Sequence, residues 1–99
     1  MDRFREYYVL MASFAEINET SFVLQVIVLD NAEVDYLPFP ESEPIGQAFI
    51  ASLGIEGTWL QTSKSGAFRG TYAGIGWYFD ATKGEYGEFV DLEHEIPTV

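Results

Sequence analysis

The sequence contains no cysteine, and its basic residues are scarce and unevenly spread. Without a thiol there is no disulfide framework, no thiolate metal site and no cysteine nucleophile. Five basic residues face sixteen acidic ones, for a formal charge of −11, and none of the five lies between Arg5 and Lys64. Because affinity for nucleic acids and anionic lipids comes mainly from Lys and Arg, we expect neither a nucleic-acid partner nor a membrane partner.

Long apolar runs are missing too. No segment approaches the roughly 20 apolar residues that span a bilayer, and Ser13 and Glu16 interrupt the start of the chain too early for a secretory signal. The composition is nevertheless 47% hydrophobic and 16% aromatic, which is too apolar for a disordered chain. We therefore expect one soluble, non-secreted β-rich domain over residues 11–92, with an N-terminal extension (1–10) and an acidic C-terminal tail (93–99).

The first half of the chain has the pattern of a β-hairpin. Residues 5–17 are rich in Tyr, Val and Phe, residues 18–21 are polar, and residues 22–29 (FVLQVIVL) form an apolar, β-branched run. Such a run is typical of a strand buried on both faces, so we expect 22–29 to be the central strand. Its predicted core face is either Phe22, Leu24, Val26 and Val28 or the alternate set Val23, Ile27 and Leu29.

One helix is predicted after a surface connection at 31–43. The Ser-Glu-Pro sequence at 42–44 supplies a capping hydroxyl, an acid and a first-turn proline, and Gly54 is a typical C-terminal stop. The spacing predicts a helix over 43–53 with one apolar face, formed by Ile45, Phe49 and Leu53 and joined by Ala48.

The rest of the chain predicts short strands separated by turns. Residues 58–62 (TWLQT) form a strand, residues 63–66 a turn, and residues 81–84 the turn before an alternating segment at 85–92. Taken together, the pattern predicts an α+β fold that is rich in β-structure. Two antiparallel hairpins form a small sheet, accompanied by one short helix.

Residues 65–80 (SGAFRGTYAGIGWYFD) combine glycines and aromatics with one arginine. The Gly-Ile-Gly at 74–76 lacks the third glycine and the following helix of a dinucleotide-binding turn, since Phe79 and a strand-like sequence stand there. Glycines inside a strand pattern mark bends or close backbone approach, so we expect Gly74 or Gly76 to have a positive φ or a close neighbour. We expect Arg69 to form a salt bridge with one of the many acids.

No residue pattern supports catalysis. The single histidine, His94, lies between Glu93 and Glu95, and adjacent residues of an extended chain seldom converge on one metal ion. The loop at 80–84 lacks the alternating acids of a calcium loop and carries a lysine in place of a ligand. We therefore expect no enzyme activity, no cofactor and no metal.

Several segments together resemble a known family. They are Met11-Ala-Ser-Phe-Ala-Glu-Ile-Asn18, Val23 to Asn31, Thr58-Trp-Leu-Gln-Thr-Ser63 and Phe68-Arg-Gly-Thr-Tyr-Ala-Gly-Ile-Gly-Trp-Tyr-Phe-Asp80. In order and spacing they resemble small, mostly uncharacterised proteins of tailed bacteriophages, especially cyanophages and marine phages, over residues 11–80. The chain departs from that family at Thr71, where Asn is usual, and in its bulkier Trp-Tyr-Phe at 77–79.

The resemblance implies a protein of the phage particle, without a catalytic residue. We expect a virion structural protein, a capsid decoration or cement protein on the outer head surface, assembled in the host cytoplasm as a homo-oligomer against capsid or other virion proteins. The acidity favours the outside of the shell, because packaged DNA repels acidic protein. A tail, baseplate or fibre-tip component is the first alternative. An acidic DNA mimic that inhibits a host protein is the second.

Contact with neighbouring proteins is expected from aromatic and terminal apolar side chains, since no polar constellation offers itself. The two chain ends carry part of this set, and the glycine-aromatic segment with the strand before it carries the rest. The candidates are Phe4, Tyr7, Tyr8, Trp59, Arg69, Tyr72, Trp77, Ile96 and Val99.

Overall fold

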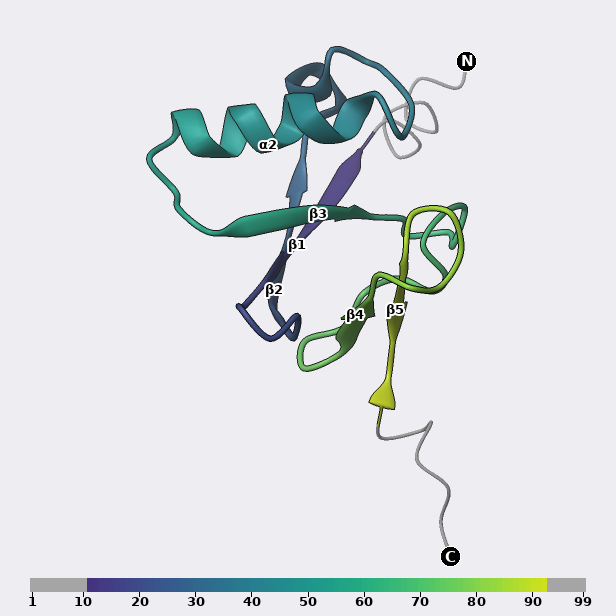
Figure 1. Ribbon diagram of the computed structural model, residues 1–99. Coiled ribbons are helices and arrows are strands. Elements are labelled where there is room, and N and C mark those ends of the chain that lie inside the picture. The colour runs from purple at the N-terminus through teal and green to yellow at the C-terminus, as the bar shows by residue number, and fades with distance from the viewer. Residues whose placement is uncertain (1–10, 93–99) are drawn as a thin grey trace, which may run out of the picture.

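The computed structural model describes residues 11–92 and confirms the α+β class (Figure 1). Two small antiparallel sheets accompany one α-helix and one 3-10 helix. In chain order the elements are β1 (Ala12–Ile17), β2 (Val23–Leu29), η1 (Asn31–Val34), α2 (Ser42–Ser52), β3 (Thr58–Thr62), β4 (Tyr78–Asp80) and β5 (Glu88–Val90). Both predicted hairpins are present, as β1–β2 and β4–β5.

The larger sheet has the strand order β2-β1-β3, so the expectation that β2 is central is wrong. β3 returns after the helix and pairs antiparallel with the free side of β1, with Phe14 opposite Gln61. This leaves the apolar β2 at an edge of the sheet. The two sheets meet at an isolated bridge between Phe22 and Tyr78, so the hairpins do not form one continuous sheet.

A bulge in β2 explains why neither predicted core face is correct. Ile17 pairs with Val23 and Glu16 with Gln25, which leaves Leu24 without an opposite residue. One extra residue reverses the alternation of side chains, so Val23 lies on the same face as Val26. β2 therefore supplies both faces of the sheet, which accounts for its almost continuous apolar sequence. Leu24 and Val28 are nevertheless 48% and 45% exposed.

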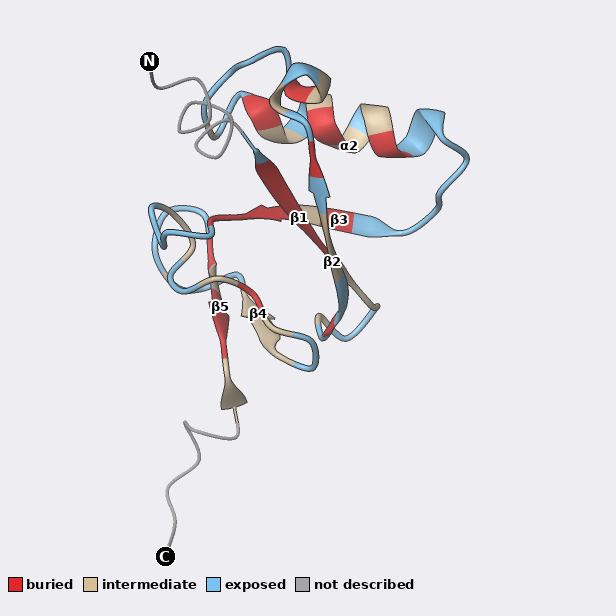
Figure 2. Cartoon of the chain, turned by 180° about the vertical axis from the view of Figure 1, so that it is seen from behind, coloured by how far each residue is buried: buried red, intermediate tan, exposed pale blue. Residues whose placement is uncertain are grey.

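The sheet lies between two hydrophobic clusters. Alternate residues of β1 point to opposite faces, with Phe14 toward α2 and Ala15 toward the β4–β5 hairpin. The helix-side cluster consists of Ala12, Phe14, Leu29, Val34, Ile50 and Trp59, with Ile27 and Phe49 against it. The hairpin-side cluster consists of Ala15, Val23, Ala73 and Phe89, with Ile17, Val26, Leu60, Trp77 and Phe79 against it. Figure 2 shows buried segments along β1, β3 and β5, with exposed segments at loops, on α2 and on β2.

Helix α2 begins and ends one residue earlier than predicted, and it buries a different face. The buried residues are Ser42, Gly46 and Ile50, whereas Leu53, expected in the core, is 57% exposed. Small side chains let the helix approach closely: a Cβ on Gly46 would stand 2.2 Å from the ring of Phe14. Ser42 does not cap the helix, since the N-cap is Glu41 and makes no side-chain capping bond. The predicted stop is confirmed, because Gly54 follows the helix with a φ of +81°.

The connection before the helix is more ordered than expected. Residues 31–34 form the 3-10 helix η1, and Val34 is fully buried in the helix-side cluster. No apolar periodicity marks so short an element, which is why the sequence pattern suggested a plain loop.

The glycine-aromatic segment bends and packs, as predicted. Gly76 has a φ of +88°, in the left-handed region that suits glycine. Its N–H donates to the Val23 carbonyl, and the Trp77 carbonyl accepts from the Val23 N–H, both at 2.8 Å. Gly74 has a close neighbour instead, since a Cβ there would lie 2.8 Å from Nε1 of Trp77. The segment thereby closes over the start of β2.

Candidate functional site

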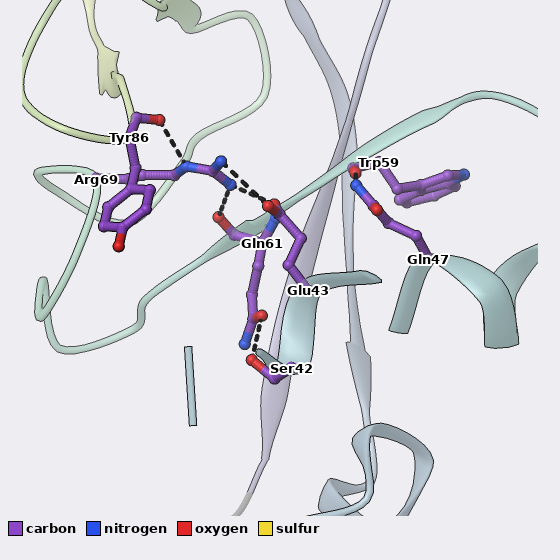
Figure 3. Close-up of polar contacts among 7 residues, drawn as sticks. All are labelled: Ser42, Glu43, Gln47, Trp59, Gln61, Arg69 and Tyr86. Atoms are coloured by element: carbon purple, nitrogen blue, oxygen red, sulfur yellow. Dashed lines mark hydrogen bonds and ion pairs between the residues drawn. The ribbon is translucent and has the colours of Figure 1, made fainter. Parts of the chain in front are cut away.

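The outer edge of β3 carries a cluster of polar contacts that come from other elements (Figure 3). From α2, Gln47 Nε2 donates to the carbonyl of Trp59 at 2.6 Å, and Glu43 Oε2 accepts from the N–H of Gln61 at 2.7 Å. Arg69 Nη1 donates to the carbonyl of Gln61 at 3.0 Å. Three backbone groups that an edge strand usually leaves open are thus paired with side chains: the carbonyl of Trp59 and the N–H and carbonyl of Gln61.

Arg69 connects α2, β3 and the β4–β5 hairpin. Its guanidinium forms an ion pair with Glu43, with Nη2 also 3.2 Å from Oε1, and its Nε donates to the Tyr86 carbonyl at 2.9 Å. The same guanidinium lies 5.1 Å and 5.3 Å from the ring centroids of Phe39 and Phe79. The side chains of Arg69 and Glu43 are 7% and 15% exposed, so this pair is largely removed from water. The predicted salt bridge of Arg69 is confirmed.

The polar groups around the Arg69–Glu43 pair form hydrogen bonds within the protein. Ser42 Oγ donates to Gln61 Oε1 at 2.7 Å within the protein, and both carboxylate oxygens of Glu43 have partners. A hydroxyl that donates to an amide, rather than to a base, is not an activated nucleophile. Within residues 11–92 no three His, Cys, Asp or Glu side chains come together as metal ligands. The contacts of this cluster hold α2, β3 and Arg69 together. They do not have the arrangement of an acid–base pair or of a metal site.

Two hollows adjoin this region. The larger, of about 850 Å³, is open to solvent and lies between the start of β1 and the loops around Leu37 and Ser65. Its lining includes Met11, Phe39 and Phe68, and Lys64 is the one charged residue among those that line it in the described part of the chain. The smaller, of about 260 Å³, lies between the end of α2 and β3. Neither brings together the paired polar groups that a catalytic pocket needs.

Two side chains near the β4–β5 hairpin have shifted pKa values. The hydroxyl and backbone N–H of Thr82 donate to Oδ1 of Asp80, at 2.6 and 3.0 Å, and lower the pKa of its carboxyl. Desolvation and the nearby charge of Glu85 raise the pKa of Tyr86. Both shifts keep the groups in their usual ionisation state at neutral pH, so neither residue is poised for proton transfer.

The structure distributes the contact candidates unevenly. Trp59 is 4% exposed and belongs to the helix-side cluster, and its Nε1 has no partner among the described residues. Tyr72 is half-buried with its hydroxyl 3.5 Å from Ser13 Oγ, and Trp77 packs against the hairpin-side cluster. Trp59 and Arg69 therefore present little surface to a partner. The terminal candidates Phe4, Tyr7, Tyr8, Ile96 and Val99, together with His94, lie outside the described residues.

Sequence reasoning missed several apolar side chains that are open to a partner. Tyr36 is 66% exposed and Ile75 is 74% exposed, each in a loop, while Leu24 and Val28 lie on β2. The loop positions had a signal, because Ile75 stands between two glycines and Tyr36 follows an acid. The positions on β2 had none, since every residue of an apolar run looks equally buried from its sequence.

The chain matches no protein-family model, no curated protein and no solved structure. No helix among residues 11–92 is long and apolar enough to cross a membrane. The phage-protein resemblance therefore stays a hypothesis that rests on the motifs quoted above.

Proposed function

We propose that this chain is a structural protein of a tailed-phage particle, a decoration protein bound to the outer surface of the head. The proposal is supported by the structural role of the phage-like motifs, which build the fold. The motif at 58–63 forms β3 and its turn, and the motif at 68–80 supplies Arg69, which pairs with Glu43 in a nearly dry setting. Both motifs specify architecture rather than a reaction.

The charge of the chain supports a place outside the shell. A formal charge of −11 on 99 residues repels packaged DNA, while an outer surface is free of that repulsion. Exposed apolar residues on a small folded domain suit contact with another protein, because the backbone that presents them is already folded before binding. A decoration protein needs a stable scaffold and a contact surface, and it needs no chemistry.

Mass spectrometry of purified, salt-washed particles of a phage that encodes this chain tests the proposal. We expect tens to hundreds of copies per particle, and a label on the chain that lies over the head in electron micrographs. A non-structural protein of the same phage, followed through the same washes, is the control for carry-over. Absence of the chain from washed particles contradicts the proposal and favours the inhibitor of a host protein.

A tail or fibre-tip component is the second candidate, and exposed loop tips favour it. Tyr36 and Ile75 stand out from the surface at 66% and 74% exposure, in the manner of side chains that contact a receptor. A few copies per particle, with label at the tail, would identify this alternative. The copy number therefore separates the two candidates.

A further inference from the structure

The outer edge of β2 differs from that of β3, and its open backbone groups can be deduced from the pairing. The N–H and C=O of Gln61 bind side chains outside the sheet, so its opposite residue on β1, Phe14, is hydrogen-bonded on its other side, to Ile27 of β2. Antiparallel strands alternate, so Val26 and Val28 direct their backbone groups away from β1. No described residue pairs with those groups.

One end of this edge already pairs with a strand-like segment. Val23 exchanges hydrogen bonds with Gly76 and Trp77 at 2.8 Å, and the Phe79 N–H donates to the Ser21 carbonyl at 2.8 Å. The edge is therefore competent to add backbone partners. Residues 76–79 cover positions 21–23, which leaves Leu24 to Leu29 as the open stretch.

Within residues 11–92, the open stretch lacks the usual protection of an edge strand. Natural edges carry charged residues, especially Lys, or proline, or are covered by another segment. Residues 23–29 contain neither a charge nor a proline. The bulge at Leu24 is a partial guard, but Leu24 and Val28 remain 48% and 45% exposed. The result is an uncharged, mainly apolar edge on an otherwise strongly acidic chain.

We propose that β2 pairs antiparallel with β2 of a second copy of this chain. A residue with outward backbone groups must face another such residue, and only the register centred on Ile27 pairs Val26 and Val28 of each copy with one another, so that Ile27 faces Ile27 across the two-fold axis. In this register Asp30 faces Leu24 of the second copy, so no acid opposes an acid. The two sheets join into one of six strands, in the order β3-β1-β2-β2-β1-β3.

A second copy is the occupant that the edge itself favours. Two molecules of charge −11 repel each other, but the seven-residue strand is uncharged and keeps like charges out of the contact. An antiparallel edge is also complementary to itself, so no other strand has to be supplied. The interface is small, so we expect weak association, with Kd in the range of about 10 µM to 1 mM. This pairing does not depend on the phage proposal.

Sedimentation of the full chain over that concentration range tests the pairing. We expect a monomer–dimer equilibrium that Val28→Lys weakens by about tenfold or more, because the lysine enters the symmetric interface twice. Leu53→Lys, at the exposed end of α2, is the matched control and leaves the equilibrium unchanged. Circular dichroism shows whether each variant is folded. A wild-type chain that stays monomeric throughout the range, or equal weakening by both lysines, overturns the proposal.

Cysteine cross-linking tests the register independently, since the chain has no cysteine of its own. Ile27→Cys places one thiol opposite its own copy in a pair where side chains approach closely, so we expect oxidation to yield a covalent dimer. Val28→Cys faces Val26 instead and is expected to stay a monomer under the same oxidant. Cross-linking of the second variant alone, or of neither at concentrations where sedimentation shows a dimer, contradicts this register.

Discussion

The two edges of the three-stranded sheet differ in whether their outward backbone groups have hydrogen-bond partners. On β3, the carbonyl of Trp59 and the N–H and carbonyl of Gln61 bind side chains from α2 and from Arg69. On β2, residues 24–29 have no such cover among the described residues. The difference arises from contacts between residues 18 and 26 positions apart in sequence, because the Glu43 carboxylate accepts from the backbone N–H of Gln61 and from the guanidinium of Arg69. Cover of an edge is a tertiary property, so strand sequences alone do not reveal it.

The largest expected effect comes from charges on the inner sides of β2. Val26→Asp and Ile27→Asp place a carboxylate against the hairpin-side and helix-side clusters respectively. The cost of burying an unpaired charge approaches the whole stability of a small domain, about 5–15 kcal/mol, so we expect neither variant to fold. Circular dichroism and solubility measure this.

Leu24→Asp is the matched control on the same strand, because its side chain lies in the bulge and is half-exposed. We expect this variant to fold. If both inner variants were soluble and folded cooperatively, β2 would not contribute to the two clusters, and its contrast with β3 would lose its basis.

Removal of Arg69 is the next largest effect and opens the covered edge. Arg69→Ala leaves the Glu43 carboxylate in a largely dry site, so we expect a loss of about 3–5 kcal/mol in the free energy of unfolding in urea. The Glu43→Ala, Arg69→Ala double variant should lose less than the sum of the two single variants, because they share one interaction. Lys64→Ala, an exposed cation nearby, is the control. A loss below about 1 kcal/mol for Arg69→Ala would mean that the pair is solvated like a surface salt bridge.

Gly76 pairs with the start of β2, and its substitution is expected to have a smaller effect on the free energy of unfolding. No atom lies within 4 Å of a Cβ at this position, so the cost of Gly76→Ala is that of the backbone conformation at a φ of +88°. We expect a loss of about 1–2 kcal/mol in unfolding free energy. Gly76→Asn should cost less, since asparagine tolerates the left-handed region. Equal losses for the two variants would argue against a conformational cause.

The smallest effect on stability is expected on the open edge. Val28→Lys and Leu24→Lys put a charge on half-exposed positions, so we expect changes within about 0.5 kcal/mol in dilute solution, where the chain is monomeric. Urea denaturation at low micromolar concentration measures this. A loss of several kcal/mol would show that the edge is covered within one chain.

Much of the fold was predictable, because it depends on local patterns. The β-branched run gave β2, the polar residues 18–21 its turn, and TWLQT the bounds of β3 without error. The strand order was not predictable in this way. Which strand is central depends on the pairing of β3 with β1, although 28 residues (30–57) lie between the end of β2 and the start of β3, and no local pattern carries that information. One bulge residue, Leu24, was enough to reverse the expected core face of β2.

The candidate site was less predictable than the fold. The many acids of the chain suggested a salt bridge for Arg69, but they did not identify Glu43 as its partner. The Ser-Glu-Pro sequence that contains Glu43 predicted only the start of a helix. The buried face of α2 was predicted incorrectly, because the buried residues Ser42 and Gly46 are small and are not apolar in a search for hydrophobic periodicity. Their burial follows from close approach to Phe14 and Gln61, which is a contact between distant segments. Burial of Trp59 removed the most prominent aromatic from the contact candidates.

Amide hydrogen exchange, followed residue by residue in dilute and in concentrated solution, tests the contrast between the two edges most directly. In dilute solution we predict strong protection at Gln61, whose N–H donates to Glu43, and fast exchange at Val26 and Val28, whose N–H groups face outward. In concentrated solution Val26 and Val28 should become protected while Gln61 stays unchanged. Fast exchange at Gln61, or protection of Val26 and Val28 that does not depend on concentration, would contradict the account.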